Sequence, residues 1–267
     1  MSKFTSIQGD NIHYATSGLA GAPWVILSHS LAADMSMWDA QLAMLEARFQ
    51  VLRFDTPGHG KSDVPADDIS MEMLAERVAR LMHQLDIQKA HFLGLSLGGM
   101  IGLGLAIAYP GRVQSLVLAD TTAAHMLAAA PMWADRAKSV DDGGMQAVVD
   151  GTLHRWFTPA FAAAQPDRLA QIKAMILATP AKGFSATCRV IPRMNFTPRL
   201  KEIICPTLVI VGAEDEATPP VHSHALQQRI VGATLVTLAS AAHVSAVEQP
   251  QAFNDALDAF YRPLLGR

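Results

Sequence analysis

The residues best suited to chemistry lie in Gly94–Gly99, a segment that reads GLSLGG. Its serine fits the pattern G-x-S-x-G, in which a serine occupies a tight turn between a strand and a helix. The apolar run Ala90–Leu95 before the serine is typical of a buried strand, and a helical pattern follows it. Such a turn holds the serine oxygen above the edge of a sheet. We therefore predict that Ser96 is a nucleophile.

A serine hydroxyl is a weak nucleophile near neutral pH, so it needs a neighbouring base. In folds with this kind of serine turn the order along the chain is serine, acid, histidine. His243 is the last of ten histidines and follows the apolar run Leu235–Leu238 and the small-residue loop Ala239–Ala242. We predict His243 as the base, and we expect His222 and His224 at the surface.

The acid that orients the histidine should follow an earlier strand. The apolar run Val209–Gly212 is followed by a loop with three neighbouring acids. We choose Asp215 from this loop and expect it to fix the imidazole tautomer. Glu216 is the adjacent competitor and Glu214 ranks below it. Asp120, at the end of another apolar run, is a more distant alternative.

Acyl transfer also needs hydrogen-bond donors aimed at the oxyanion of the tetrahedral intermediate. One is expected to be the backbone N–H of Leu97, directly after the nucleophile. The second is assigned to the N–H of Leu31, with Ser30 as the alternative, in the loop after the run Trp24–Leu27. His29, in the same loop, is expected to lie near the site, as is His59.

These residues need a scaffold that brings distant strand ends to one edge. Near-continuous apolar runs alternate with helical patterns, which predicts a mostly parallel sheet with helices on both faces, an α/β fold. The expected helices are Ser70–Leu85, Leu97–Tyr109 and one that begins near Pro250. The expected strands are Trp24–Leu27, Val51–Phe54, His91–Leu95, Leu116–Ala119, Leu208–Val211 and Leu235–Leu238.

The alternation stops between residues 121 and 200, where no clear buried strand occurs. This segment is rich in Ala, Met and Arg and holds two of the four tryptophans, Trp133 and Trp156. We predict a helical cap at 121–200, inserted into a core formed by 1–120 and 201–267.

Composition limits the remaining classes of function. Half of the 267 residues are apolar, 17% are charged and the net charge is −3, so nothing indicates binding to nucleic acid or to an anionic membrane. No signal segment or transmembrane run is evident, and a cytoplasmic protein without a cofactor is expected. The two cysteines, Cys188 and Cys205, do not suggest a disulfide framework or a metal site, and Cys205 is expected in the core.

Together these motifs resemble the α/β-hydrolase superfamily, and more closely the 3-oxoadipate enol-lactonases. The stretch Asp55–Ser62 resembles the D-x-x-G-x-G-x-S turn of the superfamily, which is structural rather than catalytic. The similarity to the lactonases covers most of the chain, and its most specific part lies within the predicted cap. The similar segments are Leu27–Gln41, Arg53–Ser62, Gly94–Gly99, Asp150–Phe161, Pro206–Pro220 and Ala241–Pro250.

This resemblance implies hydrolysis of 3-oxoadipate enol-lactone in aromatic catabolism, by acyl transfer through Ser96 and without a cofactor. The chain departs from the lactonase pattern at a few positions, which bears on the substrate more than on the reaction class. His29 replaces an expected Asn, Ala32 a Gly, Pro57 an Arg and Leu93 a Cys.

A lactone that carries a carboxylate needs a cationic partner, and an arginine fork suits it best. Arg136 lies one helical turn after Trp133, so the two could share a face, and Arg155 with Trp156 forms the second pair. We rank Arg136 first as carboxylate ligand with Trp133 as a pocket wall. For either pair, a solvated arginine beside a packing tryptophan is the alternative. The arginines considered as ligands in the cap are Arg136, Arg155, Arg168, Arg189 and Arg193.

Other functions fit the same pattern of residues. A broad carboxylesterase on short acyl esters is the nearest alternative, and a perhydrolase or a carbon–carbon bond hydrolase would keep the same triad. A dehalogenase is disfavoured because it would need Asp where this chain has Ser96. The alternative that is not an enzyme is a ligand-binding receptor on this fold. The expected partner is a small ester or lactone, and the sequence carries no signal for an oligomeric state.

Overall fold

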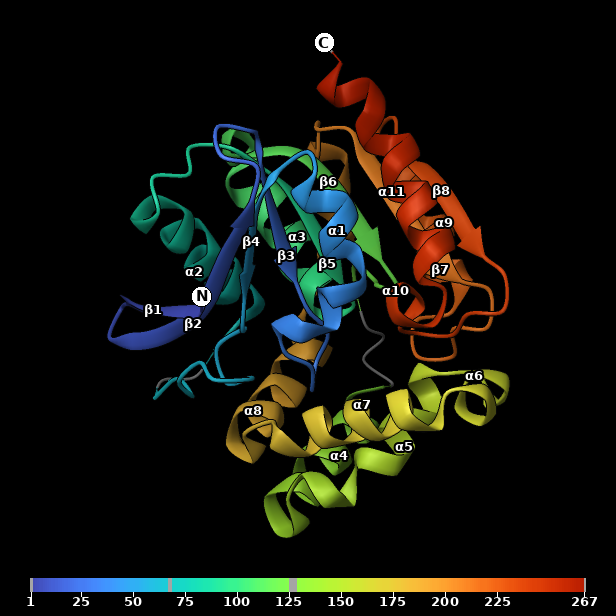
Figure 1. Cartoon of the computed structure of the whole chain (residues 1–267). Coiled ribbons are helices and arrows are strands. Elements are labelled where there is room, and N and C mark those ends of the chain that lie inside the picture. Colours follow the sequence, from blue (N-terminus) through green and yellow to red (C-terminus); the bar gives the residue numbers. More distant parts are fainter. Residues whose placement is uncertain (1, 67–68, 125–128, 267) are drawn as a thin grey trace.

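The computed structural model describes residues 2–66, 69–124 and 129–266. Its strands form one eight-stranded sheet in the order β1-β2-β4-β3-β5-β6-β7-β8 (Figure 1). All pairs from β4 to β8 are parallel, and only the β1–β2 and β2–β4 pairs are antiparallel. The strands are β1 Ser2–Ile7, β2 Asp10–Gly18, β3 Trp24–Ser28, β4 Gln50–Phe54, β5 Ala90–Leu95, β6 Val113–Ala119, β7 Thr207–Gly212 and β8 Thr234–Leu238.

The burial of the central strands explains why the sheet could be predicted from the sequence. Every residue of β5 and β7 is buried, because helices cover both faces of the sheet, and this produces continuous apolar runs. The predicted mostly parallel sheet is confirmed. The prediction that Leu235–Leu238 is a buried strand was wrong in one respect: β8 lies at the edge, where only Leu238 is fully buried.

The sequence patterns missed the hairpin of β1 and β2. Most residues of β1 are exposed, so no apolar run marks it. The two residues that join the strands, Gln8 and Gly9, both have positive φ, at 55° and 93°. A two-residue turn of this kind matches the twist of an antiparallel pair, so this short turn is the local signal that identifies the hairpin.

Helices cover the sheet on both faces (Figure 1). Helices α1 and α11 contact each other, whereas α2 packs on α3, which lies against β3, β5 and β6. The side chain of Ser70 accepts a hydrogen bond from the Met73 N–H at 3.2 Å and so caps α2. These helices are α1 Asp39–Glu46, α2 Met71–Gln84, α3 Leu97–Ala108, α9 Pro220–Arg229, α10 Ser245–Glu248 and α11 Pro250–Leu265.

Between β6 and β7 the chain forms a layer of helices beyond the edge of the sheet (Figure 1). Its entry and exit lie side by side, because Ala124 pairs with Asn195 and the Phe196 N–H donates to the Ala123 carbonyl at 2.8 Å. The predicted helical insertion is confirmed, its boundaries at 121 and 200 stay a prediction, and its residues 125–128 lie outside the described residues. The helices are α4 Ala130–Gly143, α5 Val149–Trp156, α6 Pro159–Ala164, α7 Pro166–Ala178 and α8 Ala181–Val190.

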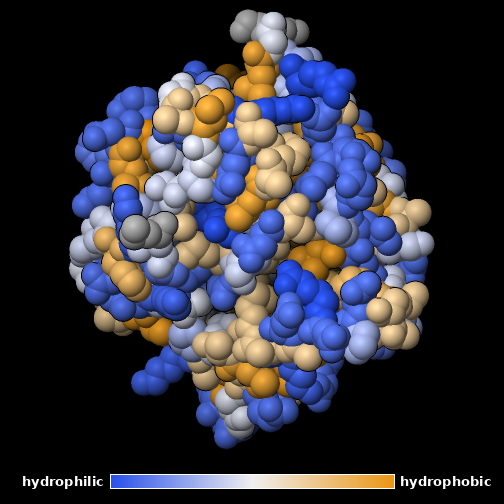
Figure 2. All heavy atoms as spheres, in the orientation of Figure 1, coloured by the Kyte–Doolittle hydropathy of each residue, from blue (hydrophilic) through white to orange (hydrophobic). Residues whose placement is uncertain are grey.

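On the face shown in Figure 2, polar residues predominate and apolar residues are scattered between them. None of the helices in the described part of the chain is both long and apolar enough to cross a membrane. Both cysteines are free thiols; Cys188 is buried, whereas Cys205, expected in the core, is only partly buried.

Candidate active site

Ser96 lies in the sharp turn between β5 and α3. Its backbone has φ 54° and ψ −111°, a conformation that costs free energy for a residue other than glycine. The neighbouring glycines make the turn possible. A Cβ on Gly94 would lie 2.2 Å from the Gly98 carbonyl oxygen, and one on Gly98 would lie 2.1 Å from the Ser28 carbonyl oxygen. The turn therefore needs glycine at both positions and holds the serine at the carboxyl edge of the sheet.

Three side chains from separate strand ends form a continuous hydrogen-bonded relay. The Ser96 Oγ lies 2.9 Å from the His243 Nε2, and the His243 Nδ1 lies 2.9 Å from the nearer oxygen of Asp215. Ser96 follows β5, Asp215 follows β7, and His243 follows β8. The structure thus brings together the three residues singled out as nucleophile, acid and base.

The acidic loop after β7 places only one of its three carboxylates against His243. Asp215 is 3% exposed, whereas Glu214 and Glu216 are exposed. One Asp215 oxygen accepts N–H bonds from Ala217 and Thr218, both at 2.8 Å, and the other accepts the Thr218 hydroxyl at 2.8 Å. Sequence reasoning missed Thr218, and its place three residues after the acid is the only signal that could have found it.

Asp120, the distant alternative for the acid, forms no hydrogen bond with His243 in the described part of the chain. One of its oxygens accepts from the Gly212 N–H at 2.9 Å, and the other accepts from the Ser245 hydroxyl at 2.6 Å. It thereby joins the ends of β6 and β7 to the loop after His243. Burial and the nearby charge of Asp215 raise the pKa of Asp120 to about 8.

The electrostatics of the relay favour a charged pair. Burial opposes the imidazolium form, but the Asp215 carboxylate and its hydrogen bond outweigh this effect and raise the pKa of His243. Burial likewise opposes the Asp215 carboxylate, but the His243 charge and the hydrogen bonds outweigh it and lower the pKa of Asp215. The arrangement stabilises the imidazolium that forms when His243 accepts a proton.

The loop after β3 is shaped by His29. The Thr56 N–H donates to its Nε2 at 2.9 Å, so its Nδ1 carries the proton and donates to the Ser30 carbonyl at 2.7 Å. No peptide bond in the described chain is cis, so the Leu31 N–H points away from that carbonyl. The residue expected to be Gly here, Ala32, has φ 64°, a conformation that favours glycine.

Among the described residues, the N–H groups of Leu31 and Leu97 have no acceptor, and neither has that of Ser30, the alternative donor. Leu31 lies outside any helix or strand and its N–H makes no backbone bond, while Leu97 opens α3, where N–H groups have no partner within the helix. Leu31, Ser30 and Ser96 line the same cavity. His29 and His59 are fully buried with ring centroids 5.5 Å apart, and neither lines the cavity.

The cavity above Ser96 has a volume of about 360 Å³, within the range of small-molecule sites. The sheet edge forms one side of it and the helical insertion forms the other. All four cap residues proposed as substrate ligands line it. Its lining includes Leu31, Ser96, Met100, Trp133, Arg136, Val148, Arg155, Trp156, Ile191, Glu216, Thr218 and His243.

Arg136 is a partly buried cation in this lining. Its guanidinium lies 5.6 Å from the ring centroid of Trp133 and 5.1 Å from that of Phe184, and it donates to the Thr152 hydroxyl at 2.8 Å. No carboxylate of the described residues forms an ion pair with it. Burial and the nearby charge of Arg155 lower the pKa of Arg136 to about 10, so it stays protonated at neutral pH. A partly buried cation without a carboxylate partner can bind an anion.

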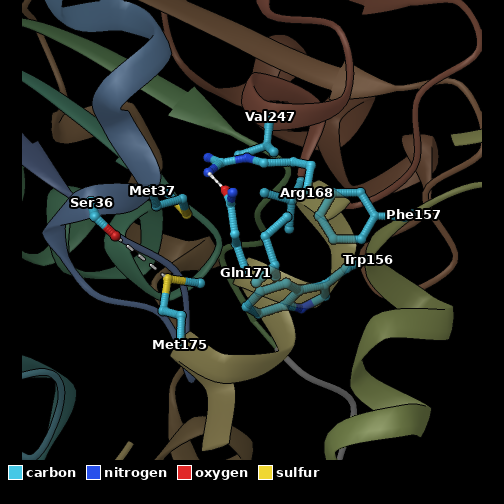
Figure 3. Close-up of a pocket in the computed structure, with 10 residues that line it drawn as sticks. Ser36, Met37, Trp156, Phe157, Arg168, Gln171, Met175 and Val247 are labelled. Atoms are coloured by element: carbon cyan, nitrogen blue, oxygen red, sulfur yellow. Dashed lines mark hydrogen bonds between the residues drawn. The ribbon is translucent and has the colours of Figure 1, made fainter. Parts of the chain in front are cut away.

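Trp156 separates this cavity from a second one of about 210 Å³. Figure 3 shows the second cavity between Met37 of the core and residues of α5 and α7, with Trp156 and Phe157 along one side. Arg168 donates to Gln171 there at 3.1 Å, and Ser96 does not line this second cavity. Among the described residues no group of three or more His, Cys, Asp or Glu side chains is arranged to hold a metal ion.

Comparison with known proteins identifies the class. Residues 23–250 match the α/β hydrolase fold family, and the chain belongs to that family.

Within it, the chain is 36% identical to 3-oxoadipate enol-lactonase 2 of Acinetobacter baylyi, over 93% of this chain and 92% of the relative. The crystal structure of the enol-lactonase from Burkholderia xenovorans LB400 superposes with a TM-score of 0.93 and 35% identity, over 97% of this chain and 100% of the other. A putative carbamate hydrolase of Pseudomonas syringae is 31% identical over 90% of this chain and 94% of that relative. The similarity thus extends over both the sheet and the insertion.

Proposed function

We propose that this protein is a serine hydrolase that cleaves a carboxylic ester or lactone through an acyl-enzyme. The observation that carries the proposal is the Ser96–His243–Asp215 relay, with contacts of 2.9 Å on both sides of the imidazole. A serine, a base within hydrogen-bond reach and a third group that orients the base form the arrangement that acyl transfer requires.

In the proposed reaction, His243 Nε2 takes the proton from Ser96 Oγ as the serine oxygen attacks the substrate carbonyl. The N–H groups of Leu31 and Leu97 hold the resulting oxyanion. The carbonyl forms again as the leaving oxygen departs with the proton from the imidazolium. In a lactone that oxygen stays tethered, so one acyl-enzyme carries the whole product. Water activated by His243 then releases the acid and restores Ser96.

We further propose that the substrate is acidic and that 3-oxoadipate enol-lactone is the best candidate. Arg136 supports this substrate, because it is a partly buried cation with no ion pair in the described chain and it lines the cavity above Ser96. A carboxylate in such a cavity gains a charge-assisted partner, which offsets its desolvation. Trp133 and Trp156 act as walls and Arg155 as a second cation in this proposal. The similarity to a protein named 3-oxoadipate enol-lactonase 2 and to the structure of an enol-lactonase supports the same substrate for this chain.

The second candidate is a carboxylesterase for short neutral esters. Apolar side chains such as Leu31, Met100 and Val148 also line the cavity, and they would suit an acyl chain without a charge. This reading gives Arg136 a structural role between Trp133, Phe184 and Thr152. Hydrolysis of a carbamate would use the same relay.

A panel of substrates separates these candidates. The enzyme should be assayed on 3-oxoadipate enol-lactone, on a lactone of similar size without a carboxylate, and on p-nitrophenyl acetate. The proposal expects the highest kcat/KM on the acidic lactone. Equal or higher kcat/KM on the neutral substrates would favour the esterase, and no turnover on any of them would contradict hydrolysis of esters and lactones. A fluorophosphonate adduct located by mass spectrometry should lie on Ser96.

A further inference from the structure

The short helix α10 contains a buried carboxylate that the proposed reaction does not use. Glu248 is 6% exposed and forms no ion pair with a cation among the described residues. Burying an unpaired charge is costly unless hydrogen-bond donors replace its water. Both oxygens of Glu248 have such donors. One accepts from the backbone N–H of Thr158 at 3.0 Å and from its hydroxyl, and the other accepts from the Ala242 N–H at 2.8 Å.

These donors come from two different parts of the molecule. Thr158 is the N-cap residue of α6 in the helical insertion, and Ala242 directly precedes His243. One side chain therefore connects the insertion to the loop that carries the proposed base. A second bond reinforces this connection on the other side of the histidine, where the Val244 N–H donates to the Trp156 carbonyl at 3.1 Å.

Apolar side chains of the same segments surround this junction. Figure 3 shows Val247 of α10 on the same cavity as Trp156 and Phe157 of the insertion. Val247 is the neighbour of Glu248, and Phe157 is the neighbour of Thr158. The ring of Phe157 stacks on that of Phe161, with centroids 4.7 Å apart. The hydrogen-bonded junction is thus shielded from water, which strengthens its hydrogen bonds.

The loop before His243 is also held from the core, where the Glu214 N–H donates to the Ala241 carbonyl at 2.9 Å and the Gln249 side chain donates to the Ser240 carbonyl at 2.8 Å. Ala239–Ala242 consists of small side chains, which interlock only weakly with their neighbours. Yet His243 must place two ring nitrogens at hydrogen-bond distance from Ser96 and Asp215. A misplacement of roughly 1 Å at a reacting group can reduce a rate by about 100-fold. Hydrogen bonds to the two residues that flank His243 are therefore well placed to set its position.

We propose that Glu248 is a positioning residue that holds the loop of His243 against the insertion. It thereby fixes the position of the base relative to the helices that line the cavity. This inference rests on the proposed function, because it assumes that His243 is the base.

The first test replaces Glu248 by glutamine. The amide keeps the size of the side chain, but its NH₂ group cannot accept a hydrogen bond, so one side of the junction loses its acceptor. Glu248→Gln is expected to lower kcat at least about tenfold and to change KM less than about threefold, because the base is misplaced while the cavity remains. Urea unfolding shows whether the variant is folded. A folded Glu248→Gln with kcat within twofold of the wild type would overturn the proposal.

Thr158 provides an independent test that does not alter the carboxylate. Thr158→Val removes one hydroxyl donor and keeps the shape, and we expect kcat to fall about three- to tenfold. Thr158→Ser restores the hydroxyl and should restore kcat. The double variant Thr158→Val/Glu248→Gln should be no slower than Glu248→Gln alone, because both changes break the same connection. Additive losses would contradict the proposal. If Glu248→Gln fails to fold, an unchanged kcat in Thr158→Val, or no rescue by serine, would contradict it.

Gln249 offers a matched control. Its side chain donates to the Ser240 carbonyl at 2.8 Å in the same loop but makes no bond to the insertion. Gln249→Leu should keep kcat within about twofold of the wild type. A loss equal to that of Glu248→Gln would contradict a specific role of the bond to the insertion, because any hydrogen bond to this loop would then have the same effect. Ser96→Ala distinguishes a failure of the proposed function from a failure of the positioning role of Glu248. If Ser96→Ala keeps its activity, the proposed function fails; if it is inactive while folded Glu248→Gln is unimpaired, only the positioning role fails.

Discussion

The carboxyl edge of the sheet and the helical insertion hold their functional side chains in different ways. At the sheet edge, backbone geometry fixes each residue: Ser96 by its strained turn, and Asp215 by two N–H groups and a hydroxyl. In the insertion, Arg136 is held by one hydroxyl and by the faces of two rings. The residues at the edge are thus fixed by many specific hydrogen bonds and by a strained turn, whereas Arg136 is held by one hydrogen bond and by packing against rings.

Substitutions in the two regions should therefore have different effects on kcat and KM. Changes at the sheet edge should reduce turnover of every substrate. Changes in the insertion should discriminate between substrates and act mainly through KM. The loop of His243 is where the two regions meet, since Val244 is bonded to Trp156 of the insertion and Ser245 to Asp120 of the core.

The largest effect is expected at the nucleophile. Ser96→Ala should lower kcat by a factor of about 10⁴ to 10⁶ on acidic and neutral substrates alike, since it removes the attacking oxygen. His243→Ala should have a similar effect, whereas His222→Ala, on α9, should be nearly silent. Steady-state rates with circular dichroism as a check of folding test this. A Ser96→Ala variant within tenfold of the wild type would exclude the serine mechanism.

The next effect concerns the acid. Asp215→Asn should lower kcat by about 10⁴, because an amide favours the wrong imidazole tautomer. Glu216→Gln and Glu214→Gln are matched controls in the same loop and should stay close to the wild type, since both side chains are exposed. Parallel kinetics of the three variants decide between the neighbouring acids. A greater loss in Glu216→Gln would transfer the role to Glu216.

A smaller and selective effect is expected in the insertion. Arg136→Met should raise KM for the acidic lactone at least about tenfold, equivalent to roughly 1.4 kcal/mol, and should hardly change activity on a neutral ester. Arg168→Met provides a control at the second cavity. Equal losses on both substrates would mean that Arg136 supports the fold of the insertion, and no loss on either would remove it from the site.

The smallest expected effect is a shift in the midpoint of the pH dependence of kcat/KM. Only neutral imidazole can accept the serine proton, so kcat/KM should rise with pH. Because the pKa of His243 is raised, the midpoint should lie above the ordinary histidine value of 6.5. In Asp215→Asn the residual activity should have a lower midpoint, because burial then acts without the opposing carboxylate. Rates between about pH 5 and pH 9 measure both, and a flat profile would argue against a histidine base.

Much of the core could be predicted because its signals are local. Continuous apolar runs mark strands that are buried on both faces, and Gly94-x-Ser96-x-Gly98 encodes a turn that other residues cannot adopt without a clash. The hairpin of β1 and β2 was missed for the opposite reason. Its exposed side chains carry no burial pattern, and its pairing with β4 depends on residues more than 30 positions away.

Patterns of neighbouring residues were enough to predict the fold class and the serine turn. The contact of one acid of the loop after β7 with His243 depends on how the strands and loops pack. The packing also places Arg136 over the ring of Phe184 without a carboxylate partner in the described chain, and it lets Glu248 join Thr158 to Ala242. These relations link positions up to 90 residues apart. Burial and hydrogen bonding at such separations depend on how the strands and helices pack, and no local pattern records it.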